Sequence, residues 1–295
     1  MSIKTITRRA PAKINLYLEI KAKRPDGYHD IESVMQTVDL FDTLTVTGRE
    51  GHGGSITIEC INKAVPCDES NLCHRAARAF FDSAAIDDYD IAISIDKRIP
   101  MAAGLGGGSS DAAAVLLALN ELYGTLFTTE HLCDIGAKIG ADVPFCIVQG
   151  ISITRGIGDV FLPCEPLPDC FFVIACAGEG VSTPWAYKRL DEMYDFASRK
   201  VSADRLATAI LSRDIANIAS AMTNIFESAV LPERETARFI RDTLDSFGAK
   251  KAMMSGSGPS VFGIFSDEAA AEKAAKILLD EGISSHICKP YYPAK

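Results

Sequence analysis

Glycine is concentrated in one short stretch of the chain, directly in front of a long apolar segment. The stretch reads IPMAAGLGGGSSDAAAVLLALNELYG from Ile99 to Gly124, with four glycines and two serines between residues 104 and 110. The apolar part predicts a buried helix that ends near Gly124. A loop with so few side chains lets an anion reach the backbone N–H groups at the N-terminus of the helix. We therefore expect a phosphate-binding loop rather than a flexible linker or a packing corner.

The loop matches neither of the two common phosphate-binding patterns. The Walker pattern requires a lysine after its last glycine, which is absent here. The dinucleotide-binding pattern GxGxxG, read from Gly104, requires a glycine where Ser109 stands. The loop must therefore hold its anion in another way.

Length and charge narrow the class of protein. A chain of 295 residues is longer than one hydrophobic core usually supports, so two domains are expected. The net charge of −9 argues against a nucleic-acid partner and against binding to an anionic membrane. The sequence shows neither an export signal nor an apolar run near the roughly 20 residues that span a bilayer. We therefore expect a cytoplasmic protein without nucleic-acid or membrane partners.

The cysteines and histidines give no metal-binding pattern. The nine cysteines form no CxxC pair, and the five histidines are scattered along the chain. We expect reduced thiols and no metal site built from these residues.

The order of predicted elements suggests two halves. Strands are expected at 5–20, 33–40, 42–48, 54–60 and 90–96. One helix is expected at 70–85, with Ser70 as its cap, a second directly after the glycine loop, and a third at 128–140. Pro25 to Gly27 predicts a hairpin turn. The proline-rich stretch from Phe161 to Cys176 predicts a boundary, giving domains 1–160 and 161–295. In the second half, helices are expected at 185–194, 203–221, 233–246 and 267–282, with strands at 171–176, 252–255, 260–265 and 285–288.

Three segments resemble the motifs of the GHMP kinases. PMAAGLGGGSSDAAAV is similar to their ATP-binding motif, and PAKINLYLEI and MMSGSGPSVFGIF are similar to the other two. APAKINLYLEIKAKRPDGYHDIESVMQTVDLFDTL, GADVPF and GEGVSTPWAY resemble one branch more narrowly, the kinases of 4-diphosphocytidyl-2-C-methyl-D-erythritol in the non-mevalonate route to isoprenoids. The resemblance extends from Arg9 to Phe265.

This resemblance implies a fold and a reaction. The fold would be α+β, with a ribosomal-protein-like, β-rich N-terminal domain that also contains helices and a ferredoxin-like α/β-sandwich C-terminal domain. The first domain would carry the ATP-binding loop and the catalytic pair, and the second a wall of the substrate site. The reaction would transfer phosphate from ATP to the 2-hydroxyl of the acceptor, with Mg²⁺. The sequence contains no pair of acidic residues recognisable as magnesium ligands, so water and phosphate oxygens would supply most of the ligands of the ion. We expect a monomer or a weak homodimer.

The resemblance also implies a catalytic pair. Asp142 of GADVPF would accept the hydroxyl proton, and Lys13 of PAKIN would orient it and steady the developing alkoxide. Positioning dominates phosphoryl transfer because its transition state is loose, so a weak base takes the proton late. Without the motifs, Asp142 would be interpreted as a turn or cap residue and Lys13 as a solvated strand lysine.

Binding residues are implied for both substrates. For ATP they are the loop residues Pro100, Met101, Ala102, Ala103, Gly104, Leu105, Gly106, Gly107, Gly108, Ser109 and Ser110, with Asn71, Leu72 and Lys97 flanking the adenine. For the acceptor they are Asn15, Tyr28, His29, Thr183 and Tyr187. Tyr28 and Tyr187 would sandwich the cytosine, and His29 would meet its edge through its backbone.

Several alternatives stay open at this point. Trp185 could be the stacking ring instead of Tyr187, the sequence SNL at Asn71 also fits a plain helix cap, and SGSGPS at Ser255 to Ser260 could be only a turn. Another GHMP kinase, acting on mevalonate or a sugar, is a second hypothesis, although the Tyr-His pair in PDGYHDIES favours a nucleobase. A noncatalytic nucleotide- or RNA-binding module is a third, and the acidic charge counts against RNA.

Overall fold

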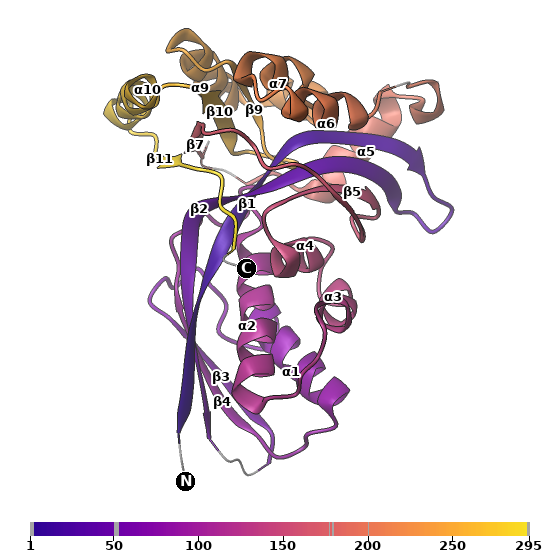
Figure 1. The fold of residues 1–295 in the computed structure, drawn as a ribbon, viewed down its shortest axis with the longest axis vertical. Helices are drawn as coiled ribbons and strands as arrows, with labels where there is room; N and C mark the ends of the chain where they lie inside the picture. The colour runs from indigo at the N-terminus through magenta and orange to yellow at the C-terminus, as the bar shows by residue number, and fades with distance from the viewer. Residues whose placement is uncertain (1–2, 50–52, 177, 179, 200, 294–295) are drawn as a thin grey trace. The chain divides into compact units, whose positions relative to one another are not determined.

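Two long strands connect the parts of the molecule. The computed structural model describes residues 3–49, 53–176, 178, 180–199 and 201–293 (Figure 1). Strand β1 (Lys4–Lys23) and strand β2 (His29–Arg49) are neighbours in one sheet. The turn between them has a hydrogen bond of 2.8 Å from Arg24 N to Tyr28 O, and Gly27 has a φ of +87°. The predicted turn at PDG is therefore present.

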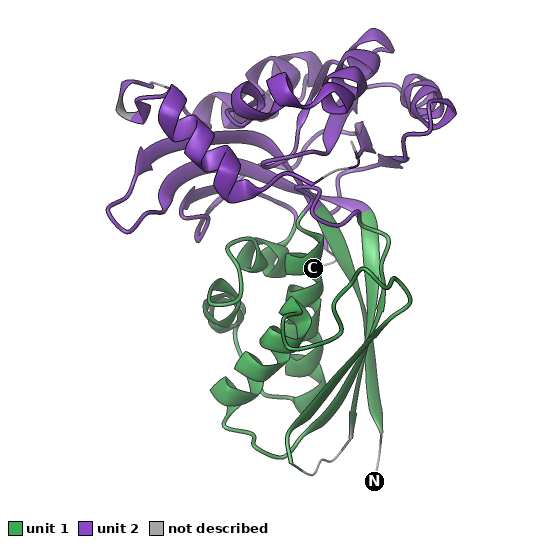
Figure 2. Ribbon diagram, turned by 180° about the vertical axis from the view of Figure 1, so that it is seen from behind, with its two compact units in different colours: residues 1–12, 40–99, 106–149 green, residues 13–39, 100–105, 150–295 purple. Residues whose placement is uncertain are grey.

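The chain forms two compact units, shown in different colours in Figure 2. Unit 1 contains residues 1–12, 40–99 and 106–149, and unit 2 contains residues 13–39, 100–105 and 150–295. The expected cut at residue 160 does not reproduce this division. The reason is that β1 and β2 each contribute residues to both units, and the glycine loop divides between Leu105 and Gly106.

Unit 1 is a sheet with helices on one face (Figure 1). Strand β4 (Asp90–Asp96) lies between β3 (Ser55–Cys60), to which it is parallel, and the second part of β2, to which it is antiparallel. The alternation of isoleucines in β4 places them at buried positions, as period two requires.

Among the residues described for this unit, the helices are α1 (Leu72–Ala84), α2 (Gly107–Tyr123), α3 (Thr129–Ala137) and α4 (Val143–Val148). Helix α1 begins after Asn71, whose side chain accepts a bond from Cys73 N, while Ser70 bonds Asp68 instead. The expected Ser70 cap is therefore wrong. Helix α2 ends at Gly124 with φ +61°, as expected, because glycine tolerates the left-handed conformation.

Unit 2 contains two sets of strands. In the first, β5 (Ile151–Gly156) is antiparallel to the first part of β2 and to β6 (Val160–Pro163), and the short β8 (Thr223–Asn224) is parallel to β1. The second is an antiparallel sheet in the order β11 (Ser285–Cys288), β7 (Phe171–Ala175), β10 (Val261–Phe265), β9 (Lys251–Met254). Helices α9 (Glu235–Ser246) and α10 (Glu268–Asp280) pack on this sheet, as in the expected α/β sandwich.

The remaining helices of unit 2 are α5 (Thr183–Met193), α6 (Asp204–Leu211), α7 (Ile215–Ala221) and α8 (Glu227–Val230), with 3₁₀ turns at Phe196–Ser198 and Leu231–Glu233. The expected single helix at 203–221 is two helices. Arg213 has a φ of +55°, and the Asp214 carboxylate accepts bonds from Ala216 N and Asn217 N to cap α7. Within the described ranges, no helix is both long and apolar enough to cross a membrane.

Candidate active site

The first part of the glycine loop is fixed within unit 2. Lys13 N donates to Leu105 O at 2.9 Å, and Ser260 N donates to Ala103 O at 3.2 Å. The hydroxyl of Ser255 donates to Gly104 O at 2.9 Å. Gly104 has a φ of +76°, and a Cβ there would lie 2.2 Å from the carbonyl oxygen of Ser255. The SGSGPS segment is therefore more than a turn before β10, because it braces the loop.

The second part of the loop opens helix α2 in unit 1. Gly106 is the N-cap, with a φ of +68° and no side chain to cap the first N–H groups of the helix. A Cβ on Gly108 would lie 3.5 Å from the side chain of Leu72, and one on Gly140 would lie 3.8 Å from Ser109 Oγ. The N-terminus of α2 therefore lies close to the start of α1 and to the segment after α3. Its uncapped N–H groups favour binding of an anion there.

Lys97 lies beside the first turn of α2 with its side chain only 5% exposed. Its ammonium group is 2.5 Å from Asp42 Oδ2 and 2.6 Å from Asp111 Oδ2. Sequence reasoning placed Lys97 at the adenine and missed both carboxylates. Asp42 is 55 positions earlier in β2, a separation at which no spacing rule applies.

Asp142 is held at the N-terminus of α4. Its backbone oxygen accepts a bond from Cys146 N, and Val143 N donates to Gly140 O, both at 3.1 Å. Val143, Phe145 and Cys146 are all buried, so the helix that carries Asp142 is anchored in the core of unit 1. Asp142 is therefore rigidly mounted, at the start of a helix that the sequence did not predict.

Lys13 and Asn15 form a buried polar chain in unit 2. Lys13 Nζ donates to Asn15 Oδ1 at 2.8 Å, and Asn15 Nδ2 donates to Ser33 Oγ at 2.9 Å. The Ser33 hydroxyl in turn donates to the Tyr17 carbonyl oxygen at 2.6 Å. Lys13 is 4% exposed, so it is not a solvated strand lysine. Ser33 was missed, because only the pairing of β1 with β2 brings it to this chain.

The expected cytosine residues are arranged differently from a simple tyrosine pair. The ring of His29 stacks on Tyr187 with centroids 4.6 Å apart, while Tyr28 is 66% exposed. His29 Nε2 is 2.7 Å from Asp191 Oδ1. The expected contact of the His29 backbone with the cytosine edge stays a prediction, and the His29 ring itself is buried against Tyr187 and Phe196. Trp185 packs against the hydrophobic core of unit 2, as Tyr187 does.

Asp191 holds His29 in place and was not foreseen. Burial acts to raise the pKa of Asp191, but hydrogen bonds from Lys23 and His29 outweigh it and hold the pKa below its ordinary value. Thr183, the first residue of α5, is also anchored, with its hydroxyl 2.9 Å from Ser257 Oγ. The start of α5 is therefore tied to the segment that braces the glycine loop.

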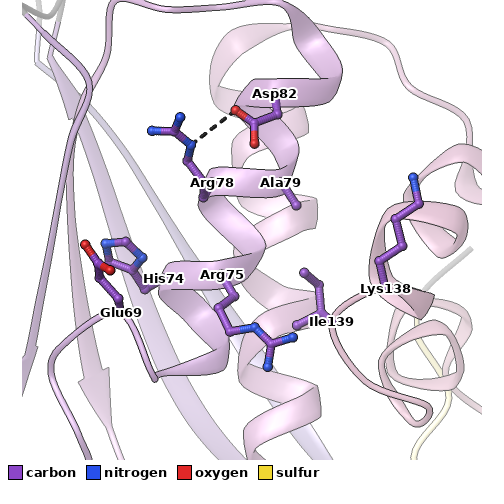
Figure 3. A pocket seen from close by; sticks show the side chains of 8 residues that line it. All are labelled: Glu69, His74, Arg75, Arg78, Ala79, Asp82, Lys138 and Ile139. Carbon is purple, nitrogen blue, oxygen red and sulfur yellow. Dashed lines mark ion pairs between the residues drawn. The ribbon is translucent and has the colours of Figure 1, made fainter.

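A pocket of about 500 Å³ lies in unit 1 between α1 and the residues that follow α3 (Figure 3). Its lining comprises Glu69, His74, Arg75, Arg78, Ala79, Asp82, Lys138 and Ile139. Arg78 pairs with Asp82 at 3.2 Å, and Figure 3 shows Arg75 extending toward Ile139. The pocket is richer in basic than in acidic groups, although the chain as a whole is acidic, so its local field suits an anion.

Magnesium is the metal that the expected reaction needs. In the part of the chain that the structure describes, no group of three His, Cys, Asp or Glu residues could hold a metal ion. Magnesium keeps several waters and is commonly bound through substrate phosphates. That the nucleotide carries most of the ion's ligands stays a prediction.

Comparison with known proteins identifies the family. The model of the GHMP kinase N-terminal domain matches residues 71–150, and that of the C-terminal domain matches residues 206–284. The 4-diphosphocytidyl-2-C-methyl-D-erythritol kinase of Lachnoclostridium phytofermentans is 40% identical over 91% of both chains. That of Gloeobacter violaceus is 41% identical over 97% of this chain and 95% of its own.

Solved structures agree with these matches. A crystal structure of 4-(cytidine 5'-diphospho)-2C-methyl-D-erythritol kinase has a TM-score of 0.81 and 29% identity, covering 98% of this chain and 100% of its own. Homoserine kinase from Cytophaga hutchinsonii shares the fold, with a TM-score of 0.73 at 20% identity over 99% and 96% of the two chains. From the glycine loop to the C-terminal sheet, the chain thus belongs to the GHMP kinase family, on the branch formed by the 4-diphosphocytidyl-2-C-methyl-D-erythritol kinases.

Proposed function

We propose that this chain transfers the γ-phosphoryl group of ATP to the 2-hydroxyl of 4-diphosphocytidyl-2-C-methyl-D-erythritol. It is an ATP-dependent kinase of isoprenoid precursor synthesis. The observation that carries the proposal is the match, at about 40% identity over nine tenths of the chain, to kinases named for this acceptor. The braced glycine loop supports it independently.

The triphosphate of ATP binds at the loop from Gly104 to Ser110. The uncapped N–H groups at the start of α2 donate to phosphate oxygens, and the helix dipole favours their negative charge. Asn71 and Leu72, at the start of α1, flank the adenine. Mg²⁺ would supply positive charge that offsets the charge of the phosphates, and phosphate oxygens and water would be most of its ligands.

Lys13 and Asp142 act on the reacting hydroxyl. The 2-hydroxyl oxygen attacks the γ-phosphorus, the bond from that phosphorus to the ADP oxygen breaks, and Asp142 accepts the hydroxyl proton. Lys13 is fixed by its bond to Asn15, so its charge is already in place when the alkoxide develops. The transition state is loose, so the work of these two groups is orientation and charge stabilisation.

The acceptor is recognised by groups of unit 2. Tyr187 offers its ring to cytosine and is backed by the buried ring of His29, which Asp191 fixes in place. Tyr28 is the exposed ring that closes over the opposite face of the base. Asn15 and Thr183 hydrogen bond the polyol. We also propose that the enzyme acts in the cytoplasm as a monomer or weak homodimer.

The proposal is tested by product formation with a panel of acceptors. The protein is mixed with ATP, Mg²⁺ and one acceptor, and ADP and the phosphorylated product are followed by ³¹P NMR. The acceptors are 4-diphosphocytidyl-2-C-methyl-D-erythritol, 2-C-methyl-D-erythritol 4-phosphate, mevalonate and homoserine. We expect one ADP per phosphorylated product, and only with the cytidine-linked polyol.

Three results would contradict the proposal. Equal turnover of the polyol phosphate without cytidine would remove the role given to the rings of unit 2. Turnover of mevalonate or homoserine alone would assign the chain to a different GHMP kinase activity. Absence of ADP with every acceptor would favour a noncatalytic nucleotide-binding module.

A further inference from the structure

A buried ionic cluster beside the glycine loop has no part in the chemistry described so far. It consists of Asp42 from β2, Lys97 from the segment after β4, and Asp111 from α2. The side chains are 0%, 5% and 5% exposed, in that order. Two carboxylates therefore share one ammonium group out of contact with water, an arrangement that is costly if both are ionised.

The two carboxylates accept different numbers of hydrogen bonds. Asp42 accepts bonds from Lys97 Nζ at 2.5 Å, Arg98 N at 2.6 Å and Ile99 N at 2.8 Å. Asp111 accepts only from Lys97, at 2.6 Å, and its Oδ1 is buried without a hydrogen-bond partner among the described residues. Asp42 is thus the carboxylate whose charge is stabilised, and Asp111 is the one that can take up a proton.

The surroundings of Asp111 favour that proton. Burial raises its pKa to about 7, and the charge of Asp42 and a hydrogen bond with Asp42 add to the effect, against the opposing charge of Lys97. Burial acts to lower the pKa of Lys97, but the two carboxylates outweigh it and raise that pKa, so Lys97 stays charged. The thiol of Cys73 is within electrostatic reach of all three side chains, and burial raises its pKa well above its ordinary value, so it stays neutral.

The cluster supports the turn of α2 that offers its N–H groups to phosphate. Asp111 follows Ser110 in the first turns of this helix. A Cβ on Gly107 would lie 3.0 Å from Lys97 Nζ and 3.1 Å from Ile99 Cγ2. The start of α2 is thus seated directly on the segment from Lys97 to Ile99, and the bond from Lys97 to Asp111 is what ties the two together.

We infer that Asp111 is a positioning residue: as a protonated carboxyl group that accepts a bond from Lys97, it holds the start of α2 in the place where its N–H groups receive the nucleotide's phosphates. The inference rests on the proposed function, since it concerns the affinity of the same loop for ATP. When the proton is lost, an ionised and partly unpaired carboxylate remains buried under the loop. The helix start is then less firmly seated, so affinity for ATP falls as pH rises.

The test compares ATP affinity across pH in three proteins by calorimetry, between about pH 5.5 and 8.5. Asp111→Asn keeps the size of the side chain and mimics its protonated form. Asp134→Asn, at an exposed position of α3, is the matched control. ATP itself titrates in this range, but its titration is common to all three proteins and cancels in the ratio of their dissociation constants.

We expect the ratio of the wild-type Kd to the Asp111→Asn Kd to be constant below pH 7 and to rise above it. The rise is at most about tenfold per pH unit, because one proton is involved. Asp134→Asn follows the wild type at every pH. In turnover assays, the difference lies in KM for ATP, with kcat unchanged.

A second readout needs no nucleotide. NMR of the protein labelled with ¹³C at aspartate carboxyl groups should show one carboxyl titrating near pH 7 that is missing from Asp111→Asn. If this variant fails to fold, Asp111→Ser, which is also neutral, replaces it in both experiments.

The outcomes separate this inference from the proposed function. Wild-type protein that binds no ATP at any pH contradicts the proposed function, and the inference with it. Protein that binds ATP with a pH-independent ratio to Asp111→Asn, or that shows no carboxyl titrating near neutrality, overturns the inference alone.

Discussion

Asp142 is the residue on which the chemistry depends most directly. We predict that Asp142→Asn lowers kcat by about 10²- to 10⁴-fold, because the group that accepts the hydroxyl proton is lost while the size of the side chain is kept. The Kd for ATP should change little, since the nucleotide is held by the loop. Both quantities are measured by ADP release and calorimetry.

The exposed carboxylate of Asp134 again provides the control, and Asp134→Asn should keep wild-type kcat. An Asp142→Asn variant with turnover close to wild type would show that this carboxylate does not take the proton. A variant that loses ATP binding in parallel would instead show that Asp142 belongs to the nucleotide site.

Single residues differ in how far the sequence determined their surroundings. Lys13 and Asn15 are two apart in a strand, so period two places them on one face, where they hydrogen bond. Lys97 gave no such signal, because its partners Asp42 and Asp111 come from other elements. The placement of His29 at the base stays a prediction, and its contact with Asp191 could not be foreseen because that residue lies 162 positions later in the chain.

At the scale of elements, the glycine loop shows what a local pattern can predict. The pattern predicted a loop, a buried helix and its end at Gly124, and each is present. It did not predict that Ser255 and Ser260 would brace the loop, because that contact joins segments 151 or more positions apart. Glycine is needed at position 104 for two reasons: its φ is positive, and a Cβ would collide with the carbonyl oxygen of Ser255.

A comparison of two glycines separates these requirements. Gly104 and Gly282 both have a φ of +76°, but a Cβ on Gly282 would meet nothing within 4 Å, whereas one on Gly104 would lie 2.2 Å from Ser255 O. We predict that Gly282→Ala costs about 1–3 kcal/mol of unfolding free energy, from backbone strain alone. Gly104→Ala should cost more and should also raise KM for ATP, because the loop must move away from Ser255.

Chemical denaturation and initial-rate kinetics measure the two effects. Equal losses of stability for both variants, with KM for ATP unchanged in Gly104→Ala, would contradict the view that contact with Ser255 shapes the loop.

Helix boundaries were less well determined than helix positions. The expected helix at 203–221 is broken at Arg213 and Asp214, where a side chain that caps α7 competes with continuation of α6. Helix α4 was missed because it has only six residues, too few for a periodic signal. Helix α3 ends at Ala137, before the expected Gly140, so a glycine alone did not mark its end.

At the scale of the whole molecule, the order of elements along the chain conceals how they are grouped. Strands β1 and β2 have 20 and 21 residues, several times the usual strand length of about 5–6. The sequence suggested shorter strands and one boundary near residue 160. Proline and glycine mark loops, but they do not show that a single strand can contribute residues to both units. The α+β class and the kinase motifs could still be predicted from local patterns, and the C-terminal sandwich from the resemblance to the GHMP kinases.

The central claim is that one loop holds the phosphates of ATP while Asp142 and Lys13 serve the acceptor hydroxyl. A crystal structure with a nonhydrolysable ATP analogue and 4-diphosphocytidyl-2-C-methyl-D-erythritol tests it most directly. We predict phosphate oxygens on the N–H groups of Gly106 to Ser109, with the 2-hydroxyl about 3–3.5 Å from the γ-phosphorus and within hydrogen-bond reach of Asp142. Phosphates bound away from this loop, or a 2-hydroxyl directed away from both Asp142 and Lys13, would contradict the account.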